Sequence, residues 1–388
     1  MSLRSQNSEK SWRLAITAGS AVCPLGLGTA SILQKMMNQQ GPLGNYQGGF
    51  LRLNSESDQA MAVGLGAREK KLDRVHRMAI LTAQKIRGNL GRSDYFGVVV
   101  GSSRGATTAF EAFHADFLAN RRLSPLASPV TTSGMLGASV ARHLGCKGIV
   151  QTVSTTCSTG LNALMIGAMM ILSQQTPTVF IGAAEAANTE FSWEMLRAAK
   201  VLADLSQQRY PVRPFGVNRS GTILSEGSFG LVLTRESNDP LGYLLGIGNG
   251  METGSLTGVS ENGDALVIAL TQALAKSGLD PDDIDLIVPH GAGTLKGDAA
   301  ELQAYHEVFG DQIPTLVPHK WALGHALGAS SGISLLLALE HLHSGLVPDL
   351  PYELVEQVQF KPLLQPKNAI VVSLGFGGYA TAAVVSKC

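Results

Sequence analysis

The segment Val153-Ser-Thr-Thr-Cys157-Ser-Thr-Gly160-Leu-Asn-Ala-Leu164 joins a β-branched run, a cysteine among small residues, and a helical pattern that continues to about Ser173. This order predicts a strand, a sharp turn and a helix, with Cys157 at the turn. A thiol there faces the unpaired N–H groups and positive dipole end of the helix, so we expect its pKa to be lowered. Small neighbours leave room for a substrate carbonyl, and the position suits nucleophilic attack on a thioester or ester. The alternative is a buried structural cysteine.

Two histidine motifs lie downstream, each rich in glycine and each at the end of an apolar run. They are Val288-Pro-His290-Gly-Ala-Gly-Thr294-Leu-Lys-Gly297 and His319-Lys-Trp-Ala-Leu-Gly324-His325-Ala-Leu-Gly328. A single histidine in such a turn is more often structural than catalytic. Two of them, with one candidate thiol upstream, favour a site made of Cys157, His290 and His325.

Length and composition define the class of protein. With 388 residues, of which 45% are hydrophobic and 15% charged, the chain can bury a large core or two fused half-domains. Lys and Arg together number 30, as do Asp and Glu. The positive and negative charges therefore balance, and the net charge gives no reason to expect a nucleic-acid partner. The most apolar helical segment, Leu161 to Leu172, is too short and too interrupted by glycine to span a bilayer, and we expect a soluble protein with no membrane span.

The four cysteines, Cys23, Cys146, Cys157 and Cys388, have no CxxC or metal-ligand spacing, so we expect no metal site. A nucleophilic thiol persists best in a reducing compartment, which indicates a cytoplasmic protein. Residues 1–10 are polar and lack the apolar core of a signal peptide, and we expect them to form a frayed tail.

Short β-rich runs alternate with helical patterns along the chain, which predicts α/β layers. The predicted strands are Arg13–Ala18, Phe96–Gly101, Ile149–Val153, Thr178–Ile181, Ser228–Leu233, Leu241–Ile247, Leu286–Val288, Thr315–Pro318 and Ala369–Ser373. The predicted helices are Lys71–Arg87, Ala106–Ala119, Gly134–Leu144, Leu161–Ser173, Gly263–Ser277, Asp298–Val308 and Ser331–His343. The polar stretch from Gln39 to Asp58 has weak periodicity and is expected to be a surface loop.

The strand-then-helix order of residues 242–388 repeats that of residues 14–237, and no Pro-, Gly- or Ser-rich linker separates the two. We therefore expect two similar halves packed as one unit. Residues 11–237 would carry Cys157, and residues 238–388 would carry His290 and His325.

The three motifs and their order resemble the β-ketoacyl-acyl carrier protein synthases, specifically the synthase II-like branch of the thiolase superfamily. The resemblance covers nearly the whole chain. It includes the segments Leu14-Ala-Ile-Thr-Ala-Gly-Ser-Ala-Val-Cys-Pro24-Leu-Gly-Leu-Gly28, Arg213-Pro-Phe215, Ser225-Glu226-Gly227 and Ser373-Leu-Gly375-Phe376-Gly377-Gly378. It implies a thiolase-like α/β fold with a duplicated five-layer α/β/α/β/α core.

The resemblance also implies an acyltransferase that forms carbon–carbon bonds. Cys157 matches the cysteine that takes the acyl chain from its carrier as a thioester. His290 and His325 match the histidines that hydrogen-bond the malonyl thioester oxygen during decarboxylation and stabilise the enolate, which then attacks the acyl-Cys carbonyl. Neutral imidazoles that donate N–H suit this task.

Three further residues have implied roles at this site. Lys320 matches the lysine that orders the site through hydrogen bonds, and Glu301 matches its carboxylate neighbour; surface charges are the alternative for both. The turn around Phe376 matches the loop whose Phe N–H completes the oxyanion hole with the N–H of Cys157. A plain hairpin turn is the alternative there.

The resemblance makes acyl carrier protein the partner and implies no tightly bound cofactor. Phosphopantetheine arrives on the carrier, and Thr257 and Thr294 remain to give its arm polar contacts. Phe110 and Met135 fall at the acyl pocket near a dimer interface, in either a homodimer or a heterodimer with a ketosynthase-like subunit. Phe110 would limit pocket depth, although Phe110, Phe113 and Phe117 have the helical spacing of a core stripe.

Several positions depart from the family pattern. Ala292 stands where Thr is usual, Gly216 where Asp follows Arg-Pro-Phe, and Tyr379-Ala380 where Thr-Asn follows the last glycine. These changes favour a pathway-specific synthase, for a polyketide or polyene chain, over housekeeping fatty-acid elongation.

The same residues bear on three rival classes of protein. A biosynthetic thiolase needs a second, basic cysteine, but Cys388 lies outside any Gly-rich motif. A synthase III-like enzyme pairs its cysteine with His and Asn, whereas His325 here occupies a second histidine motif. The main alternative is a non-catalytic chain-length partner subunit, which usually lacks the nucleophile, if Ala292 and Tyr379 close the carrier entrance.

Overall fold

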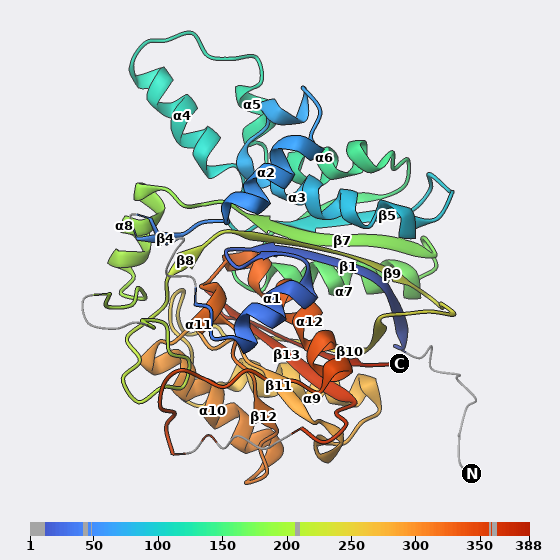
Figure 1. Cartoon of the computed structure of the whole chain (residues 1–388), viewed down its shortest axis with the longest axis vertical. Helices are drawn as coiled ribbons and strands as arrows, with labels where there is room; N and C mark the ends of the chain where they lie inside the picture. Colours follow the sequence, from blue (N-terminus) through green and yellow to red (C-terminus); the bar gives the residue numbers. More distant parts are fainter. Residues whose placement is uncertain (1–11, 42–45, 48, 206–209, 357, 359–362) are drawn as a thin grey trace.

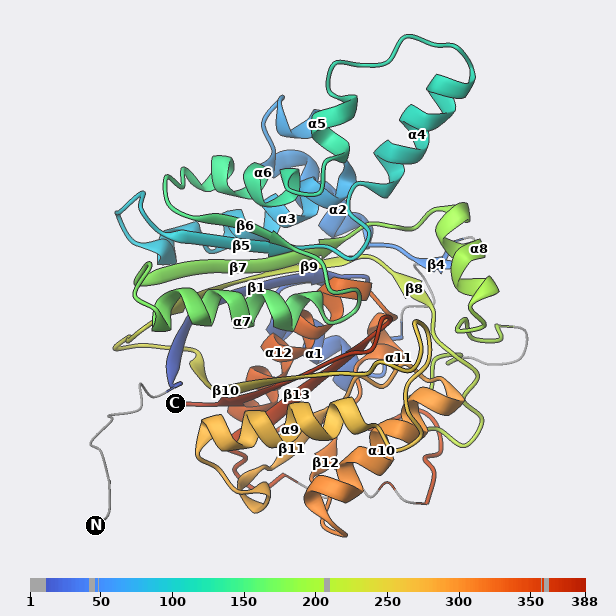
Figure 2. The same ribbon diagram turned by 180° about the vertical axis from the view of Figure 1, so that it is seen from behind.

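A computed structural model describes residues 12–41, 46–47, 49–205, 210–356, 358 and 363–388. The tail expected at residues 1–10 lies outside the described residues. Five layers are stacked in Figures 1 and 2: outer helices, a sheet, central helices, a second sheet and a second set of outer helices. The predicted α/β/α/β/α fold is therefore confirmed. Within the described residues, no helix combines the length and apolar character needed to cross a bilayer.

The two sheet layers contain five main strands each. The first is ordered β6 (Val150–Val153), β5 (Gly97–Gly101), β7 (Thr178–Glu185), β9 (Gly227–Thr234) and β1 (Leu14–Cys23). The second is ordered β12 (Thr315–Leu316), β11 (Leu286–Val288), β13 (Asn368–Gly375), β14 (Tyr379–Ser386) and β10 (Gly242–Met251). Pairing of β1 with β10, for example Leu14 with Leu244, joins the two layers.

Strand direction follows the same pattern in both layers. In the first, β6, β5 and β7 are parallel, whereas β9 is antiparallel to both β7 and β1. In the second, β12, β11 and β13 are parallel, whereas β14 is antiparallel to both β13 and β10. The segments that follow β6 and β12 thus occupy equivalent places in the two halves, and they carry Cys157 and His325.

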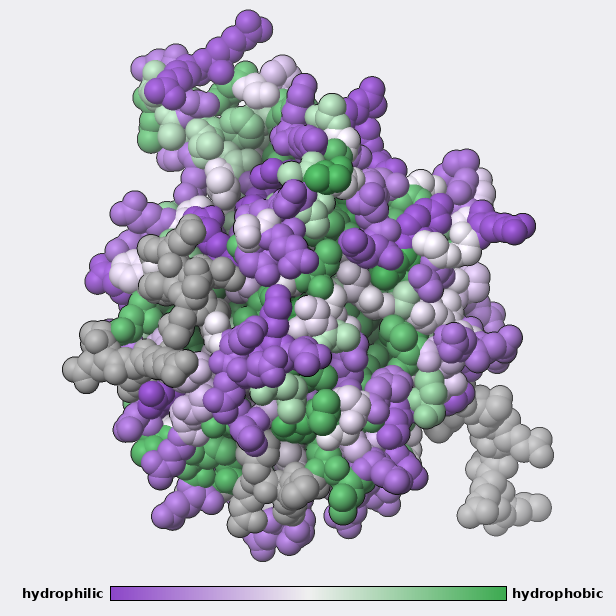
Figure 3. All heavy atoms as spheres, in the orientation of Figure 1, coloured by the Kyte–Doolittle hydropathy of each residue, from purple (hydrophilic) through white to green (hydrophobic). Residues whose placement is uncertain are grey.

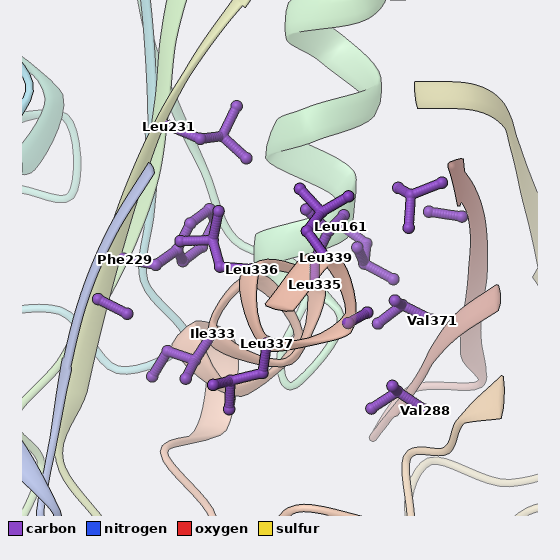
Figure 4. Close-up of a cluster of buried hydrophobic side chains, with 14 of the residues drawn as sticks. Leu161, Phe229, Leu231, Val288, Ile333, Leu335, Leu336, Leu337, Leu339 and Val371 are labelled. Carbon is purple, nitrogen blue, oxygen red and sulfur yellow. The ribbon is translucent and has the colours of Figure 1, made fainter. Parts of the chain in front are cut away.

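The central layer holds α7 (Thr159–Leu172), α12 (Leu327–Ser344) and α1 (Thr29–Met37). Glycines allow α7 and α12 to approach closely, because a Cβ on Gly160 would lie only 3.0 Å from the Gly328 carbonyl oxygen and the Gly332 nitrogen. Leucines of α12 fill the space between the sheets, together with side chains such as Phe229 and Val371 (Figure 4). This core fixes the N-terminal ends of both helices, where the candidate site lies.

The outer layers cover the remaining face of each sheet. Helices α2 (Ser55–Gly64), α3 (Arg74–Lys85) and α6 (Met135–Leu144) lie over the first sheet, and α9 (Asp264–Ser277) and α10 (Leu295–Phe309) lie over the second. The shorter elements are β2 (Gly26–Leu27), β3 (Tyr46–Gln47), β4 (Phe50–Leu51), β8 (Leu224–Ser225), α5 (Ala127–Thr131), α8 (Glu190–Ala198) and α11 (Lys320–Leu323).

Every predicted strand and helix overlaps an observed element of the same type. The surface loop expected at Gln39–Asp58 is wrong within its described part, because β4 is buried and pairs with β8, and α2 begins at Ser55. The sequence analysis also missed α1, α8 and β14.

Helix α4 (Thr107–Leu118), with α5, forms an arm that projects from the first outer layer (Figures 1 and 2). The interpretation of its aromatic stripe as core is wrong: Phe110 is 61% exposed and Phe117 is 62% exposed. The arm extends past the body, so its apolar face has little of its own chain to pack against. Figure 3 shows hydrophobic side chains gathered on this arm.

Candidate active site

Cys157 lies in the turn between β6 and α7, as the sequence predicts. Thr156 before it has a φ of 51°, in the left-handed region that β-branched residues rarely adopt. The Thr159 hydroxyl donates to the Thr156 carbonyl oxygen at 2.7 Å, which holds the turn. The Ser158 hydroxyl donates to the Ser373 carbonyl at 3.1 Å, and the Ser373 hydroxyl donates to the Cys157 carbonyl at 2.9 Å. The turn is therefore fastened to β13 in the other half.

The expected lowering of the Cys157 pKa is wrong. Burial raises the pKa of the thiol to about 12, the positive charge of Lys320 opposes this shift, and the negative charge of Glu185 adds to it. Loss of hydration thus outweighs both Lys320 and the N-terminal end of α7. The resting thiol is protonated at neutral pH, and its proton must leave as the sulfur attacks.

Apolar side chains pack beside the nucleophile. Cys157 contacts a small cluster whose members come from β4, the segment after β7, β8 and the start of α12: Phe50, Ala187, Leu224 and Leu327. Trp193 and Leu196 of α8 pack at its margin. The sequence analysis did not single out these residues, because they lie on elements that it missed or on separate short segments. Cys157 therefore has an apolar side here and a charged neighbour in Lys320.

His290 follows β11, and its backbone is held on both sides. Glu301 of α10 accepts the N–H groups of His290 and Gly291, each at 2.7 Å, and the Tyr305 hydroxyl at 2.9 Å. The Lys320 ammonium donates to the His290 carbonyl oxygen. Glu301 is 1% exposed and Lys320 is 5% exposed, so the alternative that they are surface charges is wrong.

His325 lies two residues before α12, as Cys157 does before α7. The rings of His290 and His325 meet edge to face, with their centroids 5.2 Å apart. The Ser330 hydroxyl is 3.1 Å from His325 Nδ1; when it donates there, Nε2 carries the hydrogen and can donate to a substrate. Burial lowers the pKa of both imidazoles well below the ordinary value, so both are neutral at pH 7.

The charge of Lys320 links the three reactive side chains. It lowers the pKa of the Cys157 thiol and of both imidazoles. Burial in turn lowers the pKa of Lys320 to about 8, against the opposing charge of Glu301. The ammonium form still predominates at pH 7, and it places a positive charge beside the thiol and the two imidazoles.

Two buried carboxyl groups near the site received no role from the sequence. Glu185, at the end of β7, accepts the Ser102 hydroxyl at 3.1 Å and the Gly328 N–H at 3.2 Å. Asp298, one helical turn before Glu301, accepts the Phe215 N–H at 2.7 Å and the Gly293 N–H at 3.0 Å. Burial raises the pKa of each to about 7. The spacing of Asp298 and Glu301 was a signal that could have marked them as a pair on one helix face.

Asp298 also binds the loop that contains Gly216, one departure from the family pattern. A Cβ on Gly216 would lie 2.8 Å from the Arg213 Cβ and 3.1 Å from the Tyr352 ring, so an aspartate does not fit there. In this chain the Asp298 carboxylate holds the loop, through the Phe215 N–H. Among the described residues, no group of three or more His, Cys, Asp and Glu side chains is placed to hold a metal ion.

The turn after β13 is hydrogen-bonded to the turn that carries Cys157. The Thr156 hydroxyl donates to the Phe376 carbonyl oxygen at 3.0 Å, and the Gly377 N–H donates to the Leu256 carbonyl oxygen at 2.7 Å. Gly377 and Gly378 have φ values of 85° and 84°, which only glycine adopts readily. This segment is a hairpin turn, and it is also attached to the turn that carries Cys157.

The two threonines expected at the phosphopantetheine arm lie at different depths. Thr294 precedes α10 and is partly buried, whereas Thr257 is exposed beside Leu256, the residue that holds the Phe376 turn. Phe110 lies exposed on the arm, and Met135, at the start of α6, is partly buried. Their contacts with a substrate remain predictions, and the exposure of Phe110 means that a pocket there would need a second subunit.

Sequence profiles and curated relatives agree on one family. The profile of the β-ketoacyl synthase N-terminal domain matches residues 4–239, and that of the C-terminal domain matches residues 242–351. The chain is 25% identical over 342 residues to 3-oxoacyl-[acyl-carrier-protein] synthase 2 of Staphylococcus aureus, covering 82% of this chain and 83% of the relative. It is 28% identical over 280 residues to the mitochondrial 3-oxoacyl-[acyl-carrier-protein] synthase of Arabidopsis thaliana, covering 66% and 60%.

Solved structures show the same fold. A β-ketoacyl synthase from Burkholderia phymatum matches with a TM-score of 0.86 at 18% identity, covering 97% of this chain and 99% of that one. The ishigamide ketosynthase/chain length factor matches with a TM-score of 0.85 at 18% identity, covering 97% and 100%. The thiolase-like fold expected from the sequence is thus shown by structure as well.

Proposed function

The chain belongs to the β-ketoacyl synthase family, and from this premise we propose that it is an active ketosynthase of fatty-acid, polyketide or polyene chain elongation. It would condense an acyl group on Cys157 with malonyl-acyl carrier protein to give 3-oxoacyl-acyl carrier protein. The observation that carries the proposal is that Cys157, His290 and His325 lie around Lys320 in one site, where Lys320 and His325 are buried and Cys157 and His290 are partly buried. A chain-length partner without catalysis has no need of this complete set.

The first step is transfer of the acyl group. The Cys157 sulfur attacks the carbonyl carbon of an acyl-phosphopantetheine thioester on the carrier. The bond from this carbon to the carrier sulfur breaks, and the carrier thiol leaves with the proton that Cys157 gives up. The apolar cluster beside Cys157 gives the acyl chain neighbours of matching polarity.

The second step is decarboxylation of the malonyl thioester. The bond to the carboxylate carbon breaks, carbon dioxide leaves, and the electron pair moves to the thioester oxygen as an enolate. His290 and His325 are neutral and present adjacent rings, so each can direct one N–H to this oxygen. Lys320 and Glu301 hold the His290 backbone in place.

The last step forms the new carbon–carbon bond. The enolate carbon attacks the acyl-Cys157 carbonyl, and the N–H groups of Cys157 and Phe376 bind the resulting oxyanion. The bond to sulfur then breaks, the Cys157 thiolate takes a proton from water, and the 3-oxoacyl chain remains on the carrier. Thr257 and Thr294 would contact the phosphopantetheine arm.

The partners of this reaction are an acyl carrier protein and a second ketosynthase-like subunit, identical or different. The exposed apolar arm, with Phe110, Phe117 and Leu118, supports such a subunit, because a monomer gains nothing from presenting these side chains to water.

Intact mass after incubation with acyl-carrier proteins of several chain lengths tests the proposal. The wild-type chain should gain one acyl group, and peptide mapping should place it on Cys157. Cys157→Ala should gain none, whereas the control Cys146→Ala should behave as wild type. Release of carbon dioxide from malonyl-carrier should need His290 and His325. A folded chain that never gains an acyl group would favour the chain-length partner instead.

A further inference from the structure

Thr156 joins the two turns from which the site is built. It is bonded to Cys157 in the chain, and its hydroxyl donates to the Phe376 carbonyl oxygen at 3.0 Å. These two residues are the ones whose N–H groups the proposed function uses for the oxyanion. Thr156 is therefore a direct bridge between two donors that come from different halves of the chain.

The peptide group between Phe376 and Gly377 is held at both of its polar ends. Thr156 binds its carbonyl oxygen, and the Leu256 carbonyl accepts its N–H at 2.7 Å. On the other side of Phe376, Gly375 is paired with Tyr379 across the hairpin. A Cβ on Gly375 would collide with the Thr156 hydroxyl, so this approach also requires glycine at position 375.

The Thr156 hydroxyl is not needed to make its own turn. The Thr159 hydroxyl already closes that turn, by donating to the Thr156 carbonyl and accepting the Thr155 N–H at 2.9 Å. The backbone of Thr156 is strained, with a φ of 51°, and this conformation directs its side chain at the Phe376 turn. The Thr156 hydroxyl can therefore be removed without removing the hydrogen bonds that hold its own turn.

We propose that Thr156 is a positioning residue, whose hydroxyl sets the place of the Phe376 N–H relative to the Cys157 N–H so that both bind one oxyanion. This inference rests on the proposed function and adds a residue to it. Preorganised donors act only when they are aimed at the position of the developing charge, so a loose Phe376 turn would slow each step that forms a tetrahedral oxyanion. It would not change the reactivity of the thiol itself.

The test compares two reactions of Cys157 that differ in their need for an oxyanion hole. Acylation by a short acyl thioester of N-acetylcysteamine passes through a tetrahedral oxyanion, whereas alkylation by iodoacetamide does not. Thr156→Val keeps the β-branched shape and removes the hydroxyl. We expect its acylation rate to fall about 10- to 100-fold, somewhat less than the loss of a donor outright. Alkylation should stay within about twofold, as expected when no oxyanion forms.

Two further variants complete the series. Thr156→Ser keeps the hydroxyl and should recover most of the acylation rate. Thr156→Gly removes the hydroxyl and relieves the backbone strain, so it remains informative if Thr156→Val does not fold. The valine and glycine variants should fall in kcat more than they change KM.

Three outcomes would overturn this inference. Wild-type acylation in Thr156→Val or Thr156→Gly would show that the hydroxyl is not used. A parallel fall of acylation and alkylation would show a general effect on the turn. A wild-type chain that is alkylated but never acylated would instead remove the proposed function, and this inference with it.

Discussion

Two apolar helices of this molecule have opposite surroundings. Within α12, every residue except Glu340, His343 and Ser344 is buried, and its leucines fill the space between the sheets. In α4, only Thr107 is buried, although the helix carries three phenylalanines and a leucine. Burial of apolar surface stabilises the first helix within one chain, whereas the second exposes the same kind of surface to water.

This difference distinguishes the apolar surface that the chain buries by itself from the apolar surface that only a second molecule could cover. Cys157, His290, His325 and Lys320 are all fixed by helices and strands of the layered body. The arm carries only Phe110 from the set of predicted site residues. The residues of the proposed chemistry thus all come from one subunit, and the predicted limit on chain length belongs to the surface that a second subunit would cover.

The same substitution in both helices gives the largest expected contrast. Leu337→Ala in α12 should lower the free energy of unfolding by about 2–5 kcal/mol, because it leaves a cavity in a closed core. Leu118→Ala in α4 should change it by at most about 0.5 kcal/mol in the isolated chain. Urea denaturation of dilute protein measures both values. Equal losses would contradict the division between the two helices.

Loss of either histidine should be nearly as large an effect, but on rate. His290→Ala and His325→Ala should each slow malonyl decarboxylation about 100- to 1000-fold, as expected when one oxyanion donor is removed. Acylation of Cys157 should change far less, since neither ring is used there. Labelled carbon dioxide release and intact mass measure the two steps. Wild-type decarboxylation in both variants would refute the assignment.

The sequence was most informative where chemistry restricts residue choice. Cysteine and histidine in Gly-rich turns after apolar runs marked Cys157, His290 and His325, and the resemblance supplied Lys320, Glu301 and Phe376. The strand β14 was missed because alanines such as Ala380, Ala382 and Ala383 have weak strand propensity, although all three are buried. Its burial comes from neighbours that are distant in sequence.

Burial also explains the two errors about the site. The sign of the Cys157 pKa shift depends on hydration, and the position of a cysteine before a helix does not report hydration. The aromatic stripe of α4 has the spacing of a core face, but periodicity does not report whether the same chain covers that face, and here it does not. Glu185 gave no local signal, because its partners come from two segments that are distant from it in sequence, residues 102–104 and Gly328.

A pair of buried histidines, His319 before α11 and His341 in α12, offers a smaller test of the closed core. His319 Nε2 lies 3.0 Å from His341 Nε2, and burial lowers the pKa of His341 to about 4 and that of His319 well below its ordinary value. The unfolded chain binds protons at these residues first, so the stability that they confer is lost as pH falls from about 6.5 towards 4.

His341→Gln should therefore weaken the acid dependence of unfolding. The wild type should lose more stability than the variant below pH 6.5, by up to about 1.4 kcal/mol for each pH unit. Burial raises the pKa of Glu185 and of Asp298 to about 7, so these two groups make the folded chain more stable as pH falls, opposite to the histidines. Their contribution is the same in wild type and variant, and it cancels in the difference between the two free energies of unfolding. His114→Gln on α4 controls for the loss of a histidine as such. Parallel pH profiles of urea unfolding would contradict the prediction.

The smallest expected effect concerns Phe110, which lies on the arm. If a second subunit covers this arm and closes the acyl pocket, the ring takes the volume of several methylenes, and a close-packed pocket accepts extra carbons only at a strain of about 1–3 kcal/mol. Phe110→Ala should then shift preference towards longer acyl carriers by about tenfold, the equivalent of 1.4 kcal/mol. Acylation by short chains should be retained.

Because Phe110 is exposed, an effect of its truncation on chain-length preference can be distinguished from a loss of stability. Phe110 is 61% exposed in one chain, so its truncation should not produce the cost of about 3–5 kcal/mol that follows Phe→Ala in a core. Phe117→Ala, two helical turns further along the same arm, is the matched control, because it removes the same ring farther from the body. Melting temperature, sedimentation and relative acylation rates on short and long carriers distinguish the cases. An unchanged chain-length profile in a dimer of Phe110→Ala would remove Phe110 from the pocket, whereas equal shifts in both variants would indicate an effect of the arm on assembly.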